Sequence, residues 1–146
     1  MRRPFLNAAV TLAVAALLGL AQICLAQASP SPAQSPEAWK APAEVKQLQN
    51  PVKTDGRTVE RGKMLYREHC VPCHGKSGVG DGVMAKKMGY KPANLTLERL
   101  NQQADGEIFW KVSKGRPPMP EFETQLSARE RWDIVSYVRT LLKLGR

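Results

Sequence analysis

The chain has 146 residues, of which 22 are Lys or Arg and 13 are Asp or Glu, so its formal net charge at pH 7 is +9. This length fits one small domain with short additions, and three cysteines are too few for a scaffold built on several disulfides. The basic charge favours acidic protein surfaces or anionic membranes as partners.

The first 28 residues follow the pattern of a secretory signal peptide. Arg2 and Arg3 give a basic start, an apolar run covers residues 5–26, and Ala26-Gln27-Ala28 matches the small-residue pattern of a cleavage site. We therefore predict a signal peptide at residues 1–28 and a periplasmic protein, soluble or membrane-associated. The alternative is an uncleaved membrane anchor, because residues 5–26 are long enough to span a bilayer. Export also argues against nucleic acid as a partner.

Residues 29–50 have the composition of a linker. The stretch is rich in Pro and Ala, and proline fixes the backbone and removes hydrogen-bond donors, so we expect an extended linker rather than a packed element. Trp39 is its one aromatic residue. Its side chain either makes a chance contact with the domain surface or forms a docking point for a partner subunit. Single apolar residues are common on protein surfaces, which favours the chance contact.

Helical patterns dominate residues 51–146, where we predict the folded domain. A first helix is expected from near Thr58 to the cysteines, with Leu65 and Tyr66 among its apolar residues. Gly62 lies inside this helix, and a glycine there usually marks close packing because it is otherwise a poor helix former.

Three further helices are expected downstream. A short helix covers residues 83–88, and a longer one is capped by Asp105 and ends at Gly115. The last helix begins at a capping box formed by Ser127 and Glu130. No strand alternation of useful length accompanies these patterns, so the sequence predicts an all-α fold.

The segment Cys70-Val71-Pro72-Cys73-His74 has the C-x-x-C-H pattern of c-type haem attachment. Cysteines three positions apart at a helix end can each reach one vinyl group of the same porphyrin. The following histidine then lies next to the iron as the proximal ligand. The sequence therefore predicts one covalent haem c, with its iron, on Cys70, Cys73 and His74.

Two other uses of this cysteine pair fit the sequence less well. A thioredoxin-like C-x-x-C needs a strand and helix pattern around it, and none is visible. A zinc site could count His69 beside Cys70, Cys73 and His74, but ligands so close along the chain cannot easily surround one tetrahedral ion.

The sixth iron ligand follows from the few candidates that the chain offers. The sequence has two histidines, and His69 is tethered to the same side of the haem as His74. A methionine thioether also suits haem iron and raises its reduction potential. Met119 lies in a loop stiffened by prolines, whereas Met84 and Met88 have helical spacing that favours packing. We therefore predict Met119 as the sixth ligand.

Several further motifs accompany the attachment pattern. They are Arg61-Gly62-Lys63, Tyr66, Gly80-Asp81-Gly82, Pro92-Ala93-Asn94-Leu95, Gly106-Glu107-Ile108-Phe109, Gly115, Met119-Pro120 and Arg131-Trp132 through Tyr137-Val138-Arg139. With these motifs, nearly all of residues 51–144 resembles the class I c-type cytochromes, and the chain is also similar to monohaem subunits of bacterial respiratory complexes such as alternative complex III.

The resemblance implies a small all-α class I cytochrome c fold. In that fold the first and last helices would cross at Gly62, with Tyr66 and Tyr137 packed around the crossing. Met119 matches the family's axial methionine, and Pro92 falls in the loop that supports the haem on the histidine side.

A six-coordinate iron leaves no open position for a substrate, so the predicted function is single-electron transfer in a respiratory chain. Lys76, Lys86, Lys87 and Lys91 would either steer the protein to acidic docking surfaces of redox partners or form a solvated basic face. Two alternatives stay open. One is a haem subunit fixed in a larger oxidoreductase complex. The other is a haem enzyme or gas sensor with an open sixth position.

Overall fold

The computed structural model describes residues 39–144. The predicted signal peptide and residues 29–38 of the predicted linker lie outside this range. Within it, regular secondary structure is helical, and the single β-bridge joins Arg116 and Met119. The helices are η2 (Ala43–Gln47), α2 (Gly56–His69), α3 (Val71–His74), α4 (Val83–Lys87), α5 (Glu98–Asn101), α6 (Asp105–Lys114) and α7 (Ala128–Leu144). The predicted all-α fold is thus confirmed for this part of the chain.

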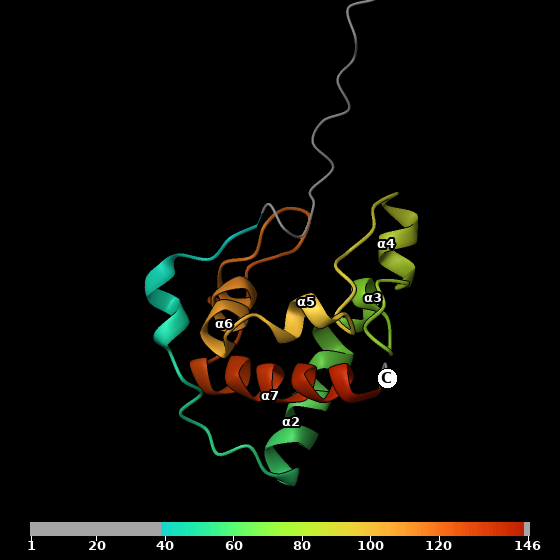
Figure 1. Ribbon diagram of the computed structural model, residues 1–146. Helices are drawn as coiled ribbons and strands as arrows, with labels where there is room; N and C mark the ends of the chain where they lie inside the picture. Colours follow the sequence, from blue (N-terminus) through green and yellow to red (C-terminus); the bar gives the residue numbers. More distant parts are fainter. Residues whose placement is uncertain (1–38, 145–146) are drawn as a thin grey trace, which may run out of the picture. The chain divides into compact units, whose positions relative to one another are not determined.

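Helices α2 and α7 cross at close range and form the centre of the fold (Figure 1). Gly62 makes this approach feasible, because a Cβ atom there would lie 2.0 Å from the backbone oxygen of Asp133. Tyr66 and Tyr137 pack beside the crossing with ring centroids 5.1 Å apart. Arg61 joins the two helices through an ion pair of 2.8 Å with Asp133. The crossing at Gly62 implied by the family resemblance is therefore confirmed.

The start of α7 follows the predicted capping box. The Ser127 N–H donates to the Glu130 carboxylate at 2.8 Å, and the Glu130 N–H donates to the Ser127 hydroxyl at 3.3 Å. These bonds satisfy N–H groups that the first turn of a helix leaves without partners.

The cap predicted at Asp105 is wrong. Asp105 is the first residue of α6, and its carboxylate accepts a hydrogen bond of 2.7 Å from Arg139 of α7. The capping bond comes instead from Glu107, whose carboxylate accepts the Ala104 N–H at 2.8 Å. The Arg139 guanidinium binds the Asp105 carboxylate in place of the N–H groups of the helix start. The local sequence around Asp105 does not reveal this partner.

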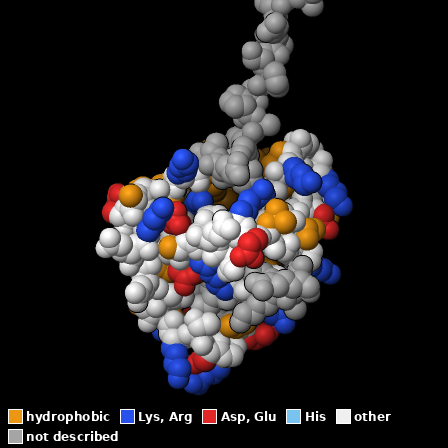
Figure 2. Space-filling view, viewed as in Figure 1, with side chains coloured by type: hydrophobic (Ala, Val, Ile, Leu, Met, Phe, Trp, Pro, Cys, Tyr) orange, Lys and Arg blue, Asp and Glu red, His pale blue; other side chains and the backbone are white. Residues whose placement is uncertain are grey.

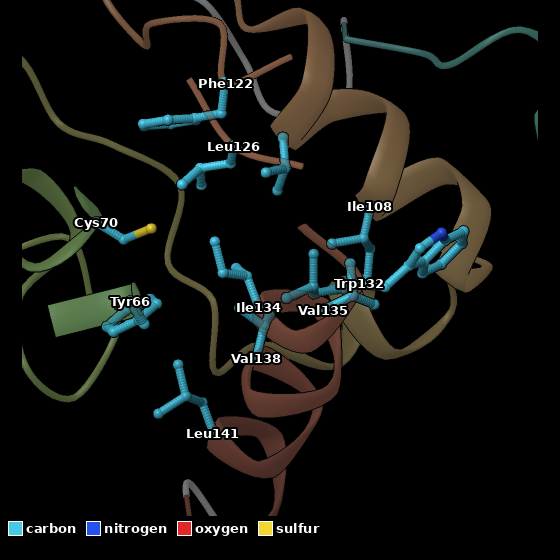
Figure 3. Close-up of a cluster of buried hydrophobic side chains, with 12 residues drawn as sticks. Tyr66, Cys70, Ile108, Phe122, Leu126, Trp132, Ile134, Val135, Val138 and Leu141 are labelled. Atoms are coloured by element: carbon cyan, nitrogen blue, oxygen red, sulfur yellow. The ribbon is translucent and has the colours of Figure 1, made fainter. Parts of the chain in front are cut away.

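A cluster of buried apolar side chains surrounds α7 (Figure 3). Five of its members come from α7 itself. The others come from α2, from Cys70 between α2 and α3, from α5 and α6, and from the loop before α7. The cluster contains Tyr66, Cys70, Leu100, Ile108, Val112, Phe122, Leu126, Trp132, Ile134, Val135, Val138 and Leu141. Cys70 is thus part of the core.

Residues 39–50 differ from the extended linker that their composition predicts, because they pack against the domain. Helix η2 contacts α6, where a Cβ at Gly106 would lie 1.9 Å from the Val45 oxygen. The Asn50 amide donates to Ser136 of α7 at 2.9 Å. Frequent prolines limit long helices, but they do not prevent a segment from packing where a glycine gives it room. We call residues 39–50 the strap.

No helix in the range 39–144 combines the length and apolar character needed to cross a membrane.

Candidate haem-attachment site

Cys70, Cys73 and His74 lie on one short turn at the end of α2, residues 70–74, which we call the attachment turn. Cys70 ends α2, with its N–H donating to the Tyr66 oxygen at 2.9 Å. The Cys70 oxygen then accepts the N–H groups of Cys73 at 3.1 Å and His74 at 2.8 Å. This turn keeps both thiols and the imidazole within one compact segment, as attachment to a single ligand requires.

Both cysteines are free thiols. Cys70 is buried in the apolar cluster, with its sulfur directed toward Leu126 and Ile134 (Figure 3). Burial, and secondarily the neighbouring Cys73, raises the pKa of the Cys70 thiol to about 12. A dithiol of the thioredoxin type needs a thiolate near neutral pH, and this environment opposes one.

The imidazole of His74 is held in the orientation that a metal ligand needs. Its Nδ1 lies 3.1 Å from the backbone oxygen of Ala93. A carbonyl oxygen only accepts hydrogen bonds, so Nδ1 carries the proton and Nε2 keeps its lone pair. Burial lowers the pKa of His74, which also favours the neutral ring. The sequence patterns did not identify Ala93 as this partner, although the family resemblance placed the neighbouring Pro92 in the loop on the histidine side of the haem.

The glycine-rich loop after His74 closes around the attachment turn. The N–H of Gly80 donates to the His74 oxygen at 2.8 Å, and that of Gly82 donates to the Cys73 oxygen at 3.0 Å. The buried Tyr66 hydroxyl donates to the Gly75 oxygen at 3.0 Å. At Gly82 a Cβ would lie 2.4 Å from the Pro72 oxygen, so a side chain there would push the loop off the turn.

Met119 lies in a tight loop between α6 and α7. Two backbone hydrogen bonds join it to Arg116, one of 2.8 Å from its own N–H and one of 3.0 Å to its oxygen. Phe122 then anchors the loop to α6, because its N–H donates to the Ser113 oxygen at 3.1 Å. Met119 is half-buried and packs against the cluster that contains Cys70. Cys70 and Met119, which are far apart in the sequence, thus belong to or contact the same apolar core.

The other methionines of the described chain lie on the surface. Met64, Met84 and Met88 are 57%, 43% and 55% exposed. His69 lies at the end of α2, with its ring 5.7 Å from the ring of Phe122. Across residues 39–144, no three His, Cys, Asp or Glu side chains converge in a way that could hold a metal ion.

These residues fit a haem. The two free thiols and the oriented imidazole would provide the attachment and one iron ligand, and the apolar side chains around Cys70 suit the porphyrin. The side chain of Met119 is half-buried on the same cluster, and its thioether is a soft donor that would suit haem iron.

Comparison with known proteins points the same way. The family model described as cytochrome c oxidase, cbb3-type, subunit III matches residues 57–138, a span that contains the attachment turn and Met119. The chain is 36% identical over 87 residues to the cytochrome bc1 complex cytochrome c subunit of Corynebacterium diphtheriae, covering 59% of this chain and 28% of that protein. It is 31% identical over 77 residues to cytochrome c6 of Parathermosynechococcus lividus, covering 53% of this chain and 83% of the relative.

One solved structure adds support for the fold. A chain of the reducing HAO-like protein complex of Kuenenia stuttgartiensis superposes with a TM-score of 0.55 at 30% identity, covering 65% of this chain and 49% of that chain. The chain therefore spans less than a third of its bc1-complex relative and about half of this structure.

Proposed function

This chain belongs to the c-type cytochromes, in the family described as cytochrome c oxidase, cbb3-type, subunit III, and on that premise we propose that it transfers single electrons through one haem c bound covalently to Cys70 and Cys73. The observation that carries the proposal is the attachment turn. It combines two free thiols with an imidazole whose Nδ1 is held by Ala93 at 3.1 Å.

His74 and Met119 are the proposed axial ligands. When bound, the haem supplies a one-electron iron couple. The bond from His74 to Ala93 fixes the ring so that Nε2 is free to bind iron, and such outer partners also increase ligand basicity. The closed loop at Met119 holds the half-buried side chain against apolar side chains of the core cluster. With both ligands in place the iron has no open position, which favours electron transfer over catalysis.

Helix α4 provides a surface for a redox partner close to the attachment turn, since it packs on α3. Val83, Met84 and Met88 are 63%, 43% and 55% exposed there, and Lys86 and Lys87 lie among them. Figure 2 shows hydrophobic and basic side chains together at the upper right, where Figure 1 places α4. We propose that this face docks redox proteins with acidic surfaces, either as a free carrier or inside a respiratory complex.

The same proposal includes export. Residues 1–28 would act as a signal peptide or as an anchor, and residues 51–146 would form the cytochrome domain, with the strap packed on it. A periplasmic or membrane-associated location suits covalent attachment, because thioether bonds keep the haem from being lost there.

Covalent attachment is tested by mass. The purified protein should carry the added mass of one haem and keep its colour after extraction with acid acetone. The double variant Cys70→Ser/Cys73→Ser should release its haem in the same extraction, because no thioether remains. Loss of the haem from the wild-type protein would contradict the covalent link.

Docking through α4 is tested by salt dependence. Reduction by an acidic redox partner should slow as ionic strength rises, because screening weakens attraction between charged surfaces. Lys86→Glu/Lys87→Glu should reduce the rate roughly tenfold at low salt. The control is Lys46→Glu/Lys53→Glu, which makes the same change in net charge at two exposed lysines, one in η2 and one beside the start of α2. Equal losses in both variants would mean that net charge, rather than this face, determines the rate.

A further inference from the structure

The strap has one aromatic side chain, and it lies against the base of the Met119 loop. Trp39 packs on Trp110 of α6 with ring centroids 6.2 Å apart. The guanidinium carbon of Arg116 lies 4.8 Å from the centroid of the Trp39 ring, and the Lys111 ammonium lies 5.8 Å from it. In Figure 1 the cyan start of the described chain runs beside the orange loop between α6 and α7.

Arg116 is the residue that closes the Met119 loop. Its N–H donates to the Met119 oxygen at 3.0 Å, and its oxygen accepts the Met119 N–H at 2.8 Å. Gly115 precedes it with φ of +59°, and a Cβ there would lie 2.5 Å from the backbone of Pro120. Any movement of the Arg116 backbone therefore changes the position of Met119.

The strap itself packs on the domain at several points, and these contacts restrict where Trp39 can lie. Ala41 is 9% exposed, and η2 approaches α6 at Gly106. Farther along, the Asn50 amide donates to the Trp132 oxygen at 3.3 Å and to the Ser136 hydroxyl at 2.9 Å. The indole ring is thus fixed from its own segment as well as by the side chains of α6.

The indole also accommodates two cations that would otherwise repel each other. Lys111 and Arg116 both lie within cation–π range of the ring. Burial lowers the pKa of Lys111, the charge of Glu107 partly offsets this effect, and the charge of Arg116 lowers the pKa further. The contact with the indole face holds the Arg116 guanidinium beside α6.

We propose that Trp39 is a positioning residue for the sixth ligand: by binding Arg116 it holds the Arg116–Met119 loop closed and keeps Met119 in place. The proposal rests on the proposed ligation of haem iron by Met119. It assigns a role in ligand retention to a residue that composition places in a linker.

The test compares four purified ferric holoproteins: wild type, Trp39→Ala, Trp39→Phe and Lys40→Ala. Each is mixed with imidazole, which can bind the iron only after Met119 has left it. Trp39→Ala should bind imidazole roughly fivefold faster than wild type, as expected when a cation–π contact of this size is lost. Trp39→Phe keeps an aromatic face and should recover most of the difference. Lys40→Ala changes the exposed neighbour and should bind at the wild-type rate.

Arg116→Gln is a second variant that leaves the strap intact. It should also bind imidazole faster, and Trp39→Ala/Arg116→Gln should be no faster than Trp39→Ala alone, because both changes remove the same contact. Wild-type imidazole rates and an unchanged reduction potential in Trp39→Ala would overturn the positioning role. A wild-type protein without the methionine–iron absorption band would overturn the proposed ligation and the positioning role with it.

Discussion

Met119→Ala is expected to lower the reduction potential by roughly 0.2 V, a fraction of the ~0.8 V over which axial ligands set haem potentials. A thioether ligand would stabilise the reduced iron, and its removal would leave water or a stronger donor to take the position. The far-red methionine–iron absorption band of the oxidised protein should disappear at the same time. Redox titration and the oxidised spectrum measure both effects.

The matched control is Met84→Ala. Met84 is 43% exposed on α4, whereas Met119 packs against the core cluster. The control should therefore keep the band and a potential close to that of wild type. If Met84→Ala removed the band and Met119→Ala did not, our choice of ligand would be wrong. A high-spin oxidised spectrum in the wild type would instead support the haem enzyme or gas sensor with an open position.

Gly62→Ala should lower the free energy of unfolding by about 3 kcal/mol, near the upper end for an overpacked site. The new Cβ would lie 2.0 Å from the Asp133 oxygen, 2.6 Å from its carbonyl carbon and 2.9 Å from the Cβ of Tyr137. Two of these atoms are backbone, so α7 must move away from α2. The movement would also lengthen the ion pair between Arg61 and Asp133.

Denaturant unfolding of the holoprotein measures this loss, with Gly56→Ala as the control. Gly56 is also in α2, but a Cβ there would meet nothing within 4 Å. That variant should be unchanged or more stable by about 0.5 kcal/mol, because alanine restricts the unfolded chain. Equal destabilisation by both substitutions would contradict the role of Gly62 at the crossing with α7.

Local chemistry explains which elements the sequence predicted well. Ser127 and Glu130 are three residues apart, and their capping bonds involve only the first turn of α7. The attachment pattern is similarly local, because a single turn carries Cys70, Cys73 and His74. Gly62 indicated a close contact through its poor helix propensity, although the identity of its partner came from the resemblance.

Features that depend on chain-distant partners were missed or misassigned. Asp105 has the chemistry of an N-cap, but the Arg139 guanidinium of α7 binds its carboxylate. The carbonyl of Ala93, which holds His74, is a backbone group that every residue has, so no side chain indicates it. Such partners become known only when the chain is folded.

The sequence by itself determined the helical class, the start of α7 and the residues that carry the proposed haem chemistry. In each case the physical cause lies within a few neighbouring residues. Only the tertiary structure decided where those residues lie. It packs Met119 on the cluster that contains Cys70, and it places Trp39 on the base of the Met119 loop. The reason is that packing depends on the space between segments as well as on the polarity of their side chains. The close approaches at Gly62 and Gly106 bring together segments that are far apart in the sequence, so they exist only in the folded chain.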